Sequence, residues 1–523
     1  MAQRRPTSMA LVLPGLLLVM LLGALDQTIM APALPTVAAD LGGLEEMPAV
    51  VVAYLVAATV VMPIYGKLGD RLGRKPVMQA AIGVFVAGAI LCGLAGSMSQ
   101  LVAFRAVQGM GGGGLMIGAQ ALIGEIVSPR ERGRYLGFVG AAYVVAAVGG
   151  PLLGGFFVDQ LSWRWIFAIY PPLGLVAFVL LAGTLRIPRP TARPPIDWAG
   201  ALTLGTAVVG TVLLAGTVGG LDAVPGWVRP GLIAATIAGY AGWLVTTRLA
   251  TDPILPLRLF RDPAFAIPVT ISFLIGFALF GTVTYVPAFL QIALGTTATQ
   301  AGLLVTSLMA GVLLTTVVSG RLITRTGKYK AFPVAGTALT ATGLALLALV
   351  GAGAPPAVLA TVLLLTGLGV GLVMQVMVLV AQNSVSYPDL GAATSAVTFL
   401  RQIGASVGVA VVGALVTWRF TERLPAGLTD RLGGGRIESL SPDALAQLPE
   451  GVRSAVSAAF GTAAPPVFGA MAPLLVLAFV LALALPVRPL RTTAHVDAHH
   501  EPTAQVATHD DATASRRHEE QLP

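Results

Sequence analysis

The chain has 523 residues, of which 55% are hydrophobic and only 11% are charged, with a formal net charge of +8 and a mean hydropathy of +0.83. A soluble domain carries about 25% charged residues, so this composition excludes soluble enzymes and secreted disulfide-bonded scaffolds. The positive charge does not indicate nucleic-acid binding, because the basic residues lie in short clusters between apolar runs. We therefore expect an all-α, polytopic membrane protein.

The sequence offers few residues for metal or thiol chemistry. The one cysteine, Cys92, lies inside an apolar run, so neither an internal disulfide nor a cysteine metal cluster is expected. We expect no metal and no cofactor, and proton chemistry inside the membrane must use carboxylates. The histidines all lie in the polar C-terminal tail, where a solvated role is favoured over metal binding: His495, His499, His500, His509 and His518.

Fourteen apolar runs are long enough to cross a membrane, because about 20 helical residues at 1.5 Å each span about 30 Å of hydrocarbon. The first run continues through Asp26 without a small-residue cleavage pattern, which argues against a signal peptide. The predicted spans are 11–38, 48–67, 77–96, 101–126, 134–158, 165–186, 198–217, 228–247, 264–291, 299–322, 332–352, 357–381, 391–418 and 467–487.

The distribution of basic residues predicts the orientation. Most of the 32 Lys and Arg residues fall on one side of the predicted spans, and short loops rich in Lys and Arg face the cytoplasm. We therefore place both termini in the cytoplasm, in a multi-pass protein of the bacterial inner membrane. Residues 419–466 are expected to form an outer loop with one or two short helices, and residues 488–523 a disordered tail.

A short segment is repeated. Gly66–Lys75 and Gly320–Lys328 share glycine, leucine, arginine and glycine at the same four positions, although Thr324 stands where Asp70 stands. Transporters are commonly built from such repeats, with the substrate path between the halves. The expected organisation is an N-terminal six-helix bundle (1–186), two additional spans (187–263), a C-terminal six-helix bundle (264–487) and the tail (488–523).

Six segments lie in a characteristic order along the chain: Leu25–Pro35, Gly66–Lys75, Leu101–Gly109, Gly150–Gly155, Trp163–Phe167 and Phe399–Gly404. Together they resemble the major facilitator superfamily, and in particular its fourteen-span drug/proton antiporter branch, the multidrug resistance exporters. The resemblance covers most of residues 20–418. Departures from the family pattern are Ala146, where the span-5 motif has its first glycine, and Tyr170-Pro171, where an Asn is usual.

Asp26 is the one acid clearly in the middle of a predicted span. A charge at the bilayer centre is costly, so such a residue normally faces the bundle interior and marks a pathway. We expect Asp26 to gain and lose a proton during transport, and the resemblance assigns Arg105 to the same proton-coupling machinery. The alternatives are a neutral structural Asp26 and a purely structural or snorkelled Arg105. Glu125 is expected to be an interfacial acid.

The resemblance also assigns a role to the motif that follows the second predicted span. Gly66, Asp70, Arg71, Gly73 and Arg74 would form a cytoplasmic latch that stabilises the outward-facing state; the alternative is that the basic residues only fix topology and bind anionic lipid.

The span-5 motif contains Gly150, Pro151, Gly154 and Gly155, which permit close helix packing and a kink. The resemblance adds an antiporter-specific seal against ion leak, whereas close packing alone is the simpler interpretation.

The sequence gives its weakest indications for the substrate-binding residues. Aromatic and polar positions in the spans make Gln108, Phe273, Phe277, Gln375 and Arg401 candidates for substrate binding. Aromatic surfaces suit apolar and variable ligands, but an aromatic stripe with helical spacing is more often lipid-facing or part of the core.

The leading hypothesis is a proton-coupled antiporter that exports hydrophobic drugs, cationic ones among them, by alternating access. The chain has no nucleotide-binding motif, so the proton gradient would supply the energy. The expected partners are a small hydrophobic substrate, protons and the bilayer, with no nucleic acid and no nucleotide, and the chain is expected to be a monomer. The alternatives are a dedicated exporter of one natural product, antibiotic or lipid, a proton–solute symporter, an intramembrane enzyme and a receptor.

Overall fold

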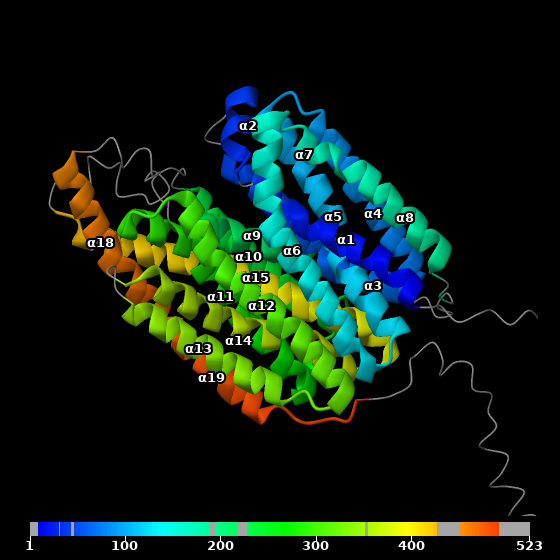
Figure 1. Ribbon diagram of the computed structural model, residues 1–523. Coiled ribbons are helices and arrows are strands. Elements are labelled where there is room, and N and C mark those ends of the chain that lie inside the picture. The colour runs from blue at the N-terminus through cyan, green and yellow to red at the C-terminus, as the bar shows by residue number, and fades with distance from the viewer. Residues whose placement is uncertain are drawn as a thin grey trace, which may run out of the picture.

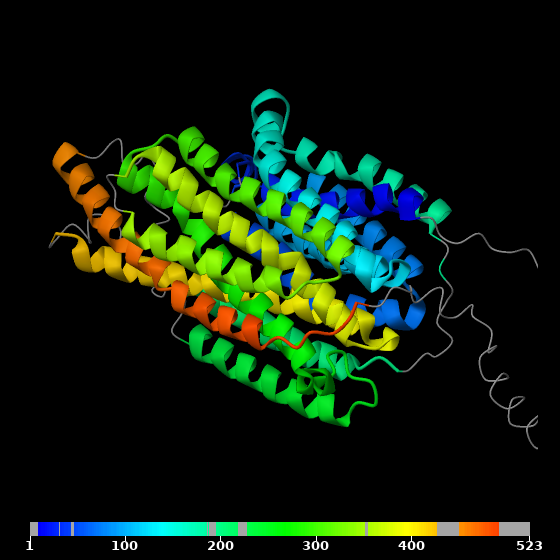
Figure 2. The ribbon, with the colours of Figure 1, turned by 60° about the horizontal axis from the view of Figure 1, so that its bottom comes forward.

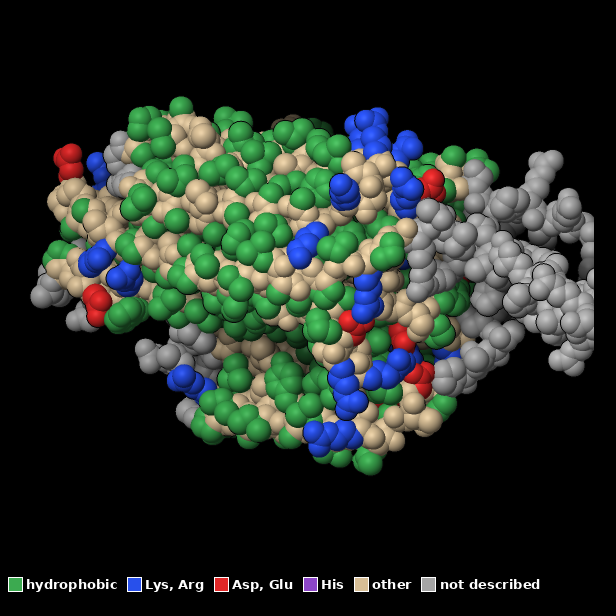
Figure 3. All heavy atoms as spheres, turned by 90° about the horizontal axis from the view of Figure 1, so that it is seen from below, with side chains coloured by type: hydrophobic (Ala, Val, Ile, Leu, Met, Phe, Trp, Pro, Cys, Tyr) green, Lys and Arg blue, Asp and Glu red, His purple; other side chains and the backbone are tan. Residues whose placement is uncertain are grey.

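The computed structural model describes residues 9–30, 32–42, 47–185, 187, 195–217, 227–350, 354–425 and 449–490. This part of the chain is almost entirely helical and contains no strand, which confirms the all-α prediction. Figure 1 shows the N-terminal helices (blue to cyan) lying against the C-terminal helices (green to orange). The surface in Figure 3 is broadly hydrophobic, with Lys and Arg gathered mostly toward the two ends of the molecule, as lipid contact requires.

The N-terminal helices pack around α5, which lies between α3 and α4, while α1 packs against α6 and α8. Their bounds are α1 (Met9–Ile29), α2 (Leu34–Leu41), α3 (Met47–Leu72), α4 (Arg74–Gly93), α5 (Met98–Ile126), α6 (Pro129–Gln160), α7 (Trp165–Ala168) and α8 (Tyr170–Thr184).

The C-terminal helices form a second group in which α11 packs against α15, and α14 packs between α12 and α13. Between the groups, α9 and α10 pair with each other, and α9 also contacts α3 and α15; Figure 2 shows this pair (green) at the lower edge. The bounds are α9 (Trp198–Thr217), α10 (Val228–Leu249), α11 (Pro263–Leu294), α12 (Ala298–Thr326), α13 (Ala331–Leu349), α14 (Pro356–Ser384), α15 (Leu390–Arg423), α18 (Glu450–Gly469) and α19 (Ala472–Ala484), with short 3₁₀ turns η3 (Leu257–Arg261) and η4 (Tyr387–Asp389).

Thirteen of the described helices are long and apolar enough to cross a membrane. Helix α5 has 29 residues, so it is long enough, but it is less apolar because it carries Arg105, Gln108, Glu125 and a run of glycines. Most of these residues are buried inside the protein and need no apolar side chain toward lipid. The count of fourteen spans therefore stays a prediction, because it requires α5 to cross the membrane as well.

Two predicted spans have wrong boundaries. The first run does not continue to residue 38: α1 ends at Ile29 and α2 begins at Leu34. Pro32 lies in this break and Pro35 in the first turn of α2, and proline cannot donate the amide hydrogen that a continuing helix needs.

The segment 419–466 is far more helical than the predicted outer loop. Helix α15 continues to Arg423, and residues 450–466 belong to α18, which packs against α11, α13 and α15. Val456 and Phe460, one helical turn apart, are fully buried in this contact. Helices α18 and α19 form one apolar stretch, so the last span begins well before residue 467. Residues 426–448, and the predicted tail beyond residue 490, lie outside the described residues.

The repeated segments form equivalent turns. Gly73 separates α3 from α4 with φ of +93°, and Gly327 ends α12 with φ of +71°. Both values lie in the region that glycine adopts without steric cost. We call the end of the molecule that carries these two turns the turn end, and the opposite end the α2 end.

At the α2 end, Asp40 holds the segment that precedes α7. Its Oδ2 accepts hydrogen bonds of 2.9 Å from Trp163 Nε1 and from Arg164 Nη1. These two bonds, the first above all, hold the pKa of Asp40 below its usual value. The attachment is therefore fully present above the ordinary pKa of an aspartate, and it is lost only as the pH falls through the lowered value.

Candidate functional site

A buried ion pair joins α1 to α5. Arg105 Nη1 lies 2.9 Å from Asp26 Oδ1 and 2.7 Å from Oδ2. Asp26 is 0% exposed and Arg105 1% exposed, so both charges are removed from solvent. The structure thus brings together the two residues that were expected to act in proton coupling. A buried carboxylate of this kind is stabilised mainly by its partner, so its proton affinity depends on that contact.

Two neutral side chains complete the pair. Gln108 Nε2 donates to Asp26 Oδ1 at 2.9 Å, and Gln108 Oε1 accepts from Arg105 Nη1 at 2.9 Å. The Arg105 guanidinium carbon also lies 4.4 Å from the centre of the Tyr54 ring, which is the geometry of a cation–π contact. Gln108 was predicted as a substrate contact, but the structure places it in this network.

Glycines in α5 make the network possible. A side-chain carbon added at Gly109 would lie 2.4 Å from the carbonyl oxygen of Tyr54, and one at Gly111 would lie 2.3 Å from the backbone nitrogen of Phe85. Helix α5 is therefore in backbone contact with α3 on one side and α4 on the other, as small residues allow in membrane bundles. This close approach carries Arg105 over the Tyr54 ring.

The span-5 motif packs directly behind Asp26. An added side-chain carbon would lie 2.0 Å from Thr28 Oγ1 at Gly150, and 2.2 Å from the Ile29 carbonyl oxygen at Gly154. At Gly155 the same atom would meet nothing within 4 Å, and Pro151 is exposed. Gly150 and Gly154 therefore contact α1 two to three residues after Asp26, whereas Pro151 and Gly155 face away from α1.

This asymmetry predicts opposite outcomes for two neighbouring substitutions. We expect Gly154→Leu to separate α6 from α1 and to lower the thermal unfolding temperature, because overpacking costs about 1–3 kcal/mol. Gly155→Leu should unfold close to the wild-type temperature, since its side chain enters open space. Thermal unfolding of both variants in the same detergent makes the comparison, and equal effects would show that the motif does not act through the α1 contact.

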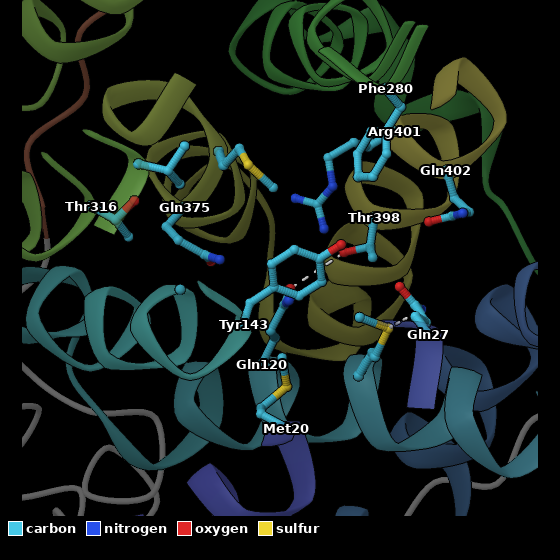
Figure 4. Close-up of a pocket in the computed structure, with 14 residues that line it drawn as sticks. Met20, Gln27, Gln120, Tyr143, Phe280, Thr316, Gln375, Thr398, Arg401 and Gln402 are labelled. Carbon is cyan, nitrogen blue, oxygen red and sulfur yellow. Dashed lines mark hydrogen bonds between the residues drawn. The ribbon is translucent and has the colours of Figure 1, made fainter. Parts of the chain in front are cut away.

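A cavity lies between the two halves of the protein, and Figure 4 shows that its lining comes from both. Two predicted substrate residues, Gln375 and Arg401, line it. Phe273 and Phe277 do not; they are half-buried in α11, whereas Phe280 lies one turn further and lines the cavity. The full lining is Met20, Gln27, Met116, Gln120, Gly140, Tyr143, Phe280, Val312, Thr316, Met374, Gln375, Thr398, Arg401 and Gln402.

Sequence reasoning missed most of these lining residues. Gln27, Gln120 and Gln402 are uncharged polar side chains inside apolar spans, and that pattern was a usable signal. Figure 4 shows the hydrogen bond of 3.3 Å that Thr398 Oγ1 donates to Gln120 Oε1 across the cavity wall, from α15 to α5. The uncharged polar groups therefore link the two halves as well as line the space.

At the turn end, Asp70 links the two halves. Its Oδ1 accepts a hydrogen bond from Arg74 Nη2 and another, of 3.2 Å, from the backbone nitrogen of Gly391 in the first turn of α15. A carboxylate at a helix N-terminus is favoured by the helix dipole. Gly66 also contacts Gly391, because a side-chain carbon at Gly66 would lie 2.7 Å from the Gly391 carbonyl oxygen. Among the described contacts, Arg71 makes none across this junction, and Gly73 contributes the turn.

Glu125 belongs to the same junction, although it was predicted to be an interfacial acid. It is 3% exposed, accepts a hydrogen bond of 3.3 Å from Arg74 Nε and another from the Tyr387 hydroxyl, and so connects α5 to η4. Burial of three charged groups within one contact makes the junction depend on complete pairing.

A second junction at the turn end joins α6 to α12. Arg130 donates to the carbonyl oxygens of Thr324 at 3.4 Å and of Arg325 at 3.3 Å, at the C-terminal end of α12. Gly133 and Gly320 are in backbone contact there. The hydrogen bonds described between the two halves all lie between Gln120 and the turn end, so the halves are held together on that side.

Comparison with known proteins supports one family. The profile described as Major Facilitator Superfamily matches residues 16–409. An uncharacterized MFS-type transporter of Mycobacterium tuberculosis (strain H37Rv) is 39% identical over 496 residues, which cover 94% of this chain and 72% of the relative. The multidrug transporter protein MdtP of Bacillus subtilis is 34% identical over 462 residues, with 84% and 85% covered.

A solved structure supports the fold. The human organic anion transporter MFSD10 (TETRAN) superposes with a TM-score of 0.61 over 92% of this chain and 100% of that one, at 16% sequence identity. At that identity the likeness concerns the fold alone. Together with the two sequence relatives, these findings confirm the resemblance drawn from the six motifs: the chain is a multi-pass membrane transporter that belongs to the major facilitator superfamily.

Proposed function

We propose that the protein exports hydrophobic small molecules in exchange for protons. Export is supported by its relatives, since MdtP is named a multidrug transporter and a second Bacillus subtilis relative, 30% identical, is named multidrug resistance protein 3. The single observation that carries proton coupling is the fully buried contact between Asp26 and Arg105. Protonation of Asp26 removes one charge of this pair, and a buried charge left without its partner is strongly unfavourable.

The coupling acid lies close to the cavity along the chain. Gln27 follows Asp26 and lines the cavity, and Met20 lines it from the same helix. A shift of α1 that accompanies proton binding would therefore move part of the cavity wall. Since α1 also packs on Gly150 and Gly154 of α6, the motif would transmit this shift to the helix that contacts α12.

Alternating access would use the turn end as one gate. The Asp70 junction and the α6–α12 junction join the two halves at that end, and we infer that together they would seal the cavity from the turn end in the described state. We assign the turn end to the cytoplasmic face of a bacterial inner membrane. Residues Met9 and Leu490, where the first helix begins and the last described stretch ends, would then lie on the cytoplasmic side.

Transport in proteoliposomes tests the proposal. With an imposed pH gradient, the neutral fluorescent dye N-phenyl-1-naphthylamine should be taken up into acidic vesicles faster than into protein-free ones, as protons leave. A protonophore should abolish the difference. Dye movement that ignores the pH gradient would contradict coupling, and dye movement in the same direction as protons would replace antiport with symport.

A further inference from the structure

Arg401 is a buried cation without an acidic partner in the described part of the chain. It lies in α15, is 9% exposed, and makes no ion pair with any residue that the structure describes. Its Nη1 atom is buried and has no hydrogen bond. Figure 4 shows the guanidinium group pointing into the cavity, with Tyr143 and Gln375 on the opposite wall.

The other buried arginines differ from Arg401. Arg105 is paired with Asp26, and Arg74 is paired with both Asp70 and Glu125. The fully buried Arg132 donates hydrogen bonds to the backbone carbonyl oxygens of Val127 and Gly124. Buried charges in membrane proteins are normally paired with one another or with backbone carbonyls, because an isolated charge in a medium of low polarity is costly. A buried arginine that points into a cavity without such a partner is explained when a ligand supplies the opposite charge.

The cavity has no acid of its own to supply that charge. None of its lining residues is Asp or Glu, so Arg401 is the one formally charged group among them. Asp26, which precedes the lining residue Gln27 in α1, is already paired with Arg105 and hydrogen-bonded to Gln108. A cationic ligand would therefore meet a like charge, and an anionic ligand an unpaired opposite one.

The rest of the lining suits an amphipathic molecule. The Oε1 atom of Gln375 is buried without a hydrogen bond, and Gln402 and Tyr143 offer further polar groups near Arg401. Met20, Met116, Phe280, Val312 and Met374 supply the apolar part of the wall.

We infer that the cavity binds hydrophobic molecules carrying one anionic group, such as a carboxylate, sulfonate or phosphate, with Arg401 as the counter-ion. A planar guanidinium recognises all three groups through paired hydrogen bonds. This inference rests on the proposed function in taking the cavity as the substrate site, and it replaces the expectation of cationic drugs with acidic ones.

Two dyes that share one ring system test the inference. Equilibrium dialysis against purified protein in an uncharged detergent compares 8-anilinonaphthalene-1-sulfonate with N-phenyl-1-naphthylamine, which lacks the sulfonate. Wild type should bind the anion at least about tenfold more tightly than the neutral dye, in line with a charge-assisted hydrogen bond. Arg401→Gln should remove this preference while retaining neutral-dye binding, and Arg401→Lys should retain part of it. Arg261→Gln, which changes an exposed arginine in η3, serves as the control.

Each outcome decides the inference. Equal binding of the two dyes by wild type, no binding of the anion, or an unchanged preference in Arg401→Gln would overturn it; the wild-type comparison holds even if that variant does not fold. Displacement of the anionic dye by phosphatidylglycerol would support the site and identify a lipid headgroup as a source of the anion. The dialysis uses no pH gradient, so it is independent of the transport assay. Preferential anion binding without gradient-driven transport would refute only the proposed function. Gradient-driven transport without preferential anion binding would refute only this inference.

Discussion

Asp26→Asn is expected to reduce pH-gradient-driven dye accumulation to the level of protein-free liposomes. Asparagine has nearly the same shape and can still accept a hydrogen bond from Arg105, but it cannot exchange a proton. Without that exchange the imposed gradient loses the fully buried acid in α1 through which it is proposed to act. Dye uptake after a step in pH measures the effect.

Removal of one charge of a buried pair also threatens folding, at a cost of about 3–5 kcal/mol. Neutral-dye binding to purified Asp26→Asn therefore serves as the test of a folded cavity, because the cavity lining does not include Asp26. Asp159→Asn, which changes an exposed acid near the end of α6, is the matched control and should transport as wild type. Full gradient-dependent uptake by a folded Asp26→Asn would move the coupling role elsewhere, with Glu125 the first candidate.

Gly320→Leu is expected to force the turn end open. A side-chain carbon at Gly320 would lie 2.2 Å from the carbonyl oxygen of Gly133, so a leucine cannot be accommodated between α12 and α6 in the closed arrangement. Overpacking costs about 1–3 kcal/mol, and about 1.4 kcal/mol changes an equilibrium tenfold. The ratio of open to closed molecules should therefore rise by a factor between about 5 and about 150.

Cysteine labelling measures this opening. Cys92 is the one native cysteine, so Cys92→Ala with Ser395→Cys places a single thiol at a fully buried position that contacts Gly66. Labelling by a polar maleimide should be slow in this background and about tenfold faster when Gly320→Leu is added. Gly302→Leu, in the same helix but facing open space, should leave the rate unchanged. Equal rates in all three would refute the α6–α12 junction as a gate.

The sequence predicted the helices better than their ends. Long apolar runs identify spans because lipid requires them, and in the structure the two repeated segments form equivalent turns at Gly73 and Gly327. The break between α1 and α2 was missed because the hydropathy of the run continues through Pro32 and Pro35. Helix α18 was missed because it begins in a polar stretch and derives its burial from α11, α13 and α15, which lie far away in the sequence.

The candidate site was predictable where one residue is chemically exceptional. Asp26 and Arg105 stand out as charges in apolar spans, and their contact is present. The cavity was not predictable, because its wall combines single residues from several helices of both halves. The inferred substrate charge depends on the absence of an acidic partner for Arg401 among the described residues. This is a property of the packed structure that no spacing in the sequence reveals.

The direction of proton movement tests the central claim most directly. Proteoliposomes loaded with a pH-sensitive dye and held at equal pH on both sides are given a gradient of a transported substrate, and the internal pH is followed. Antiport predicts that protons move opposite to the substrate, that a protonophore removes the signal, and that Asp26→Asn does not produce it. Protons that accompany the substrate, or an internal pH that stays constant while the substrate crosses, would contradict proton-coupled export.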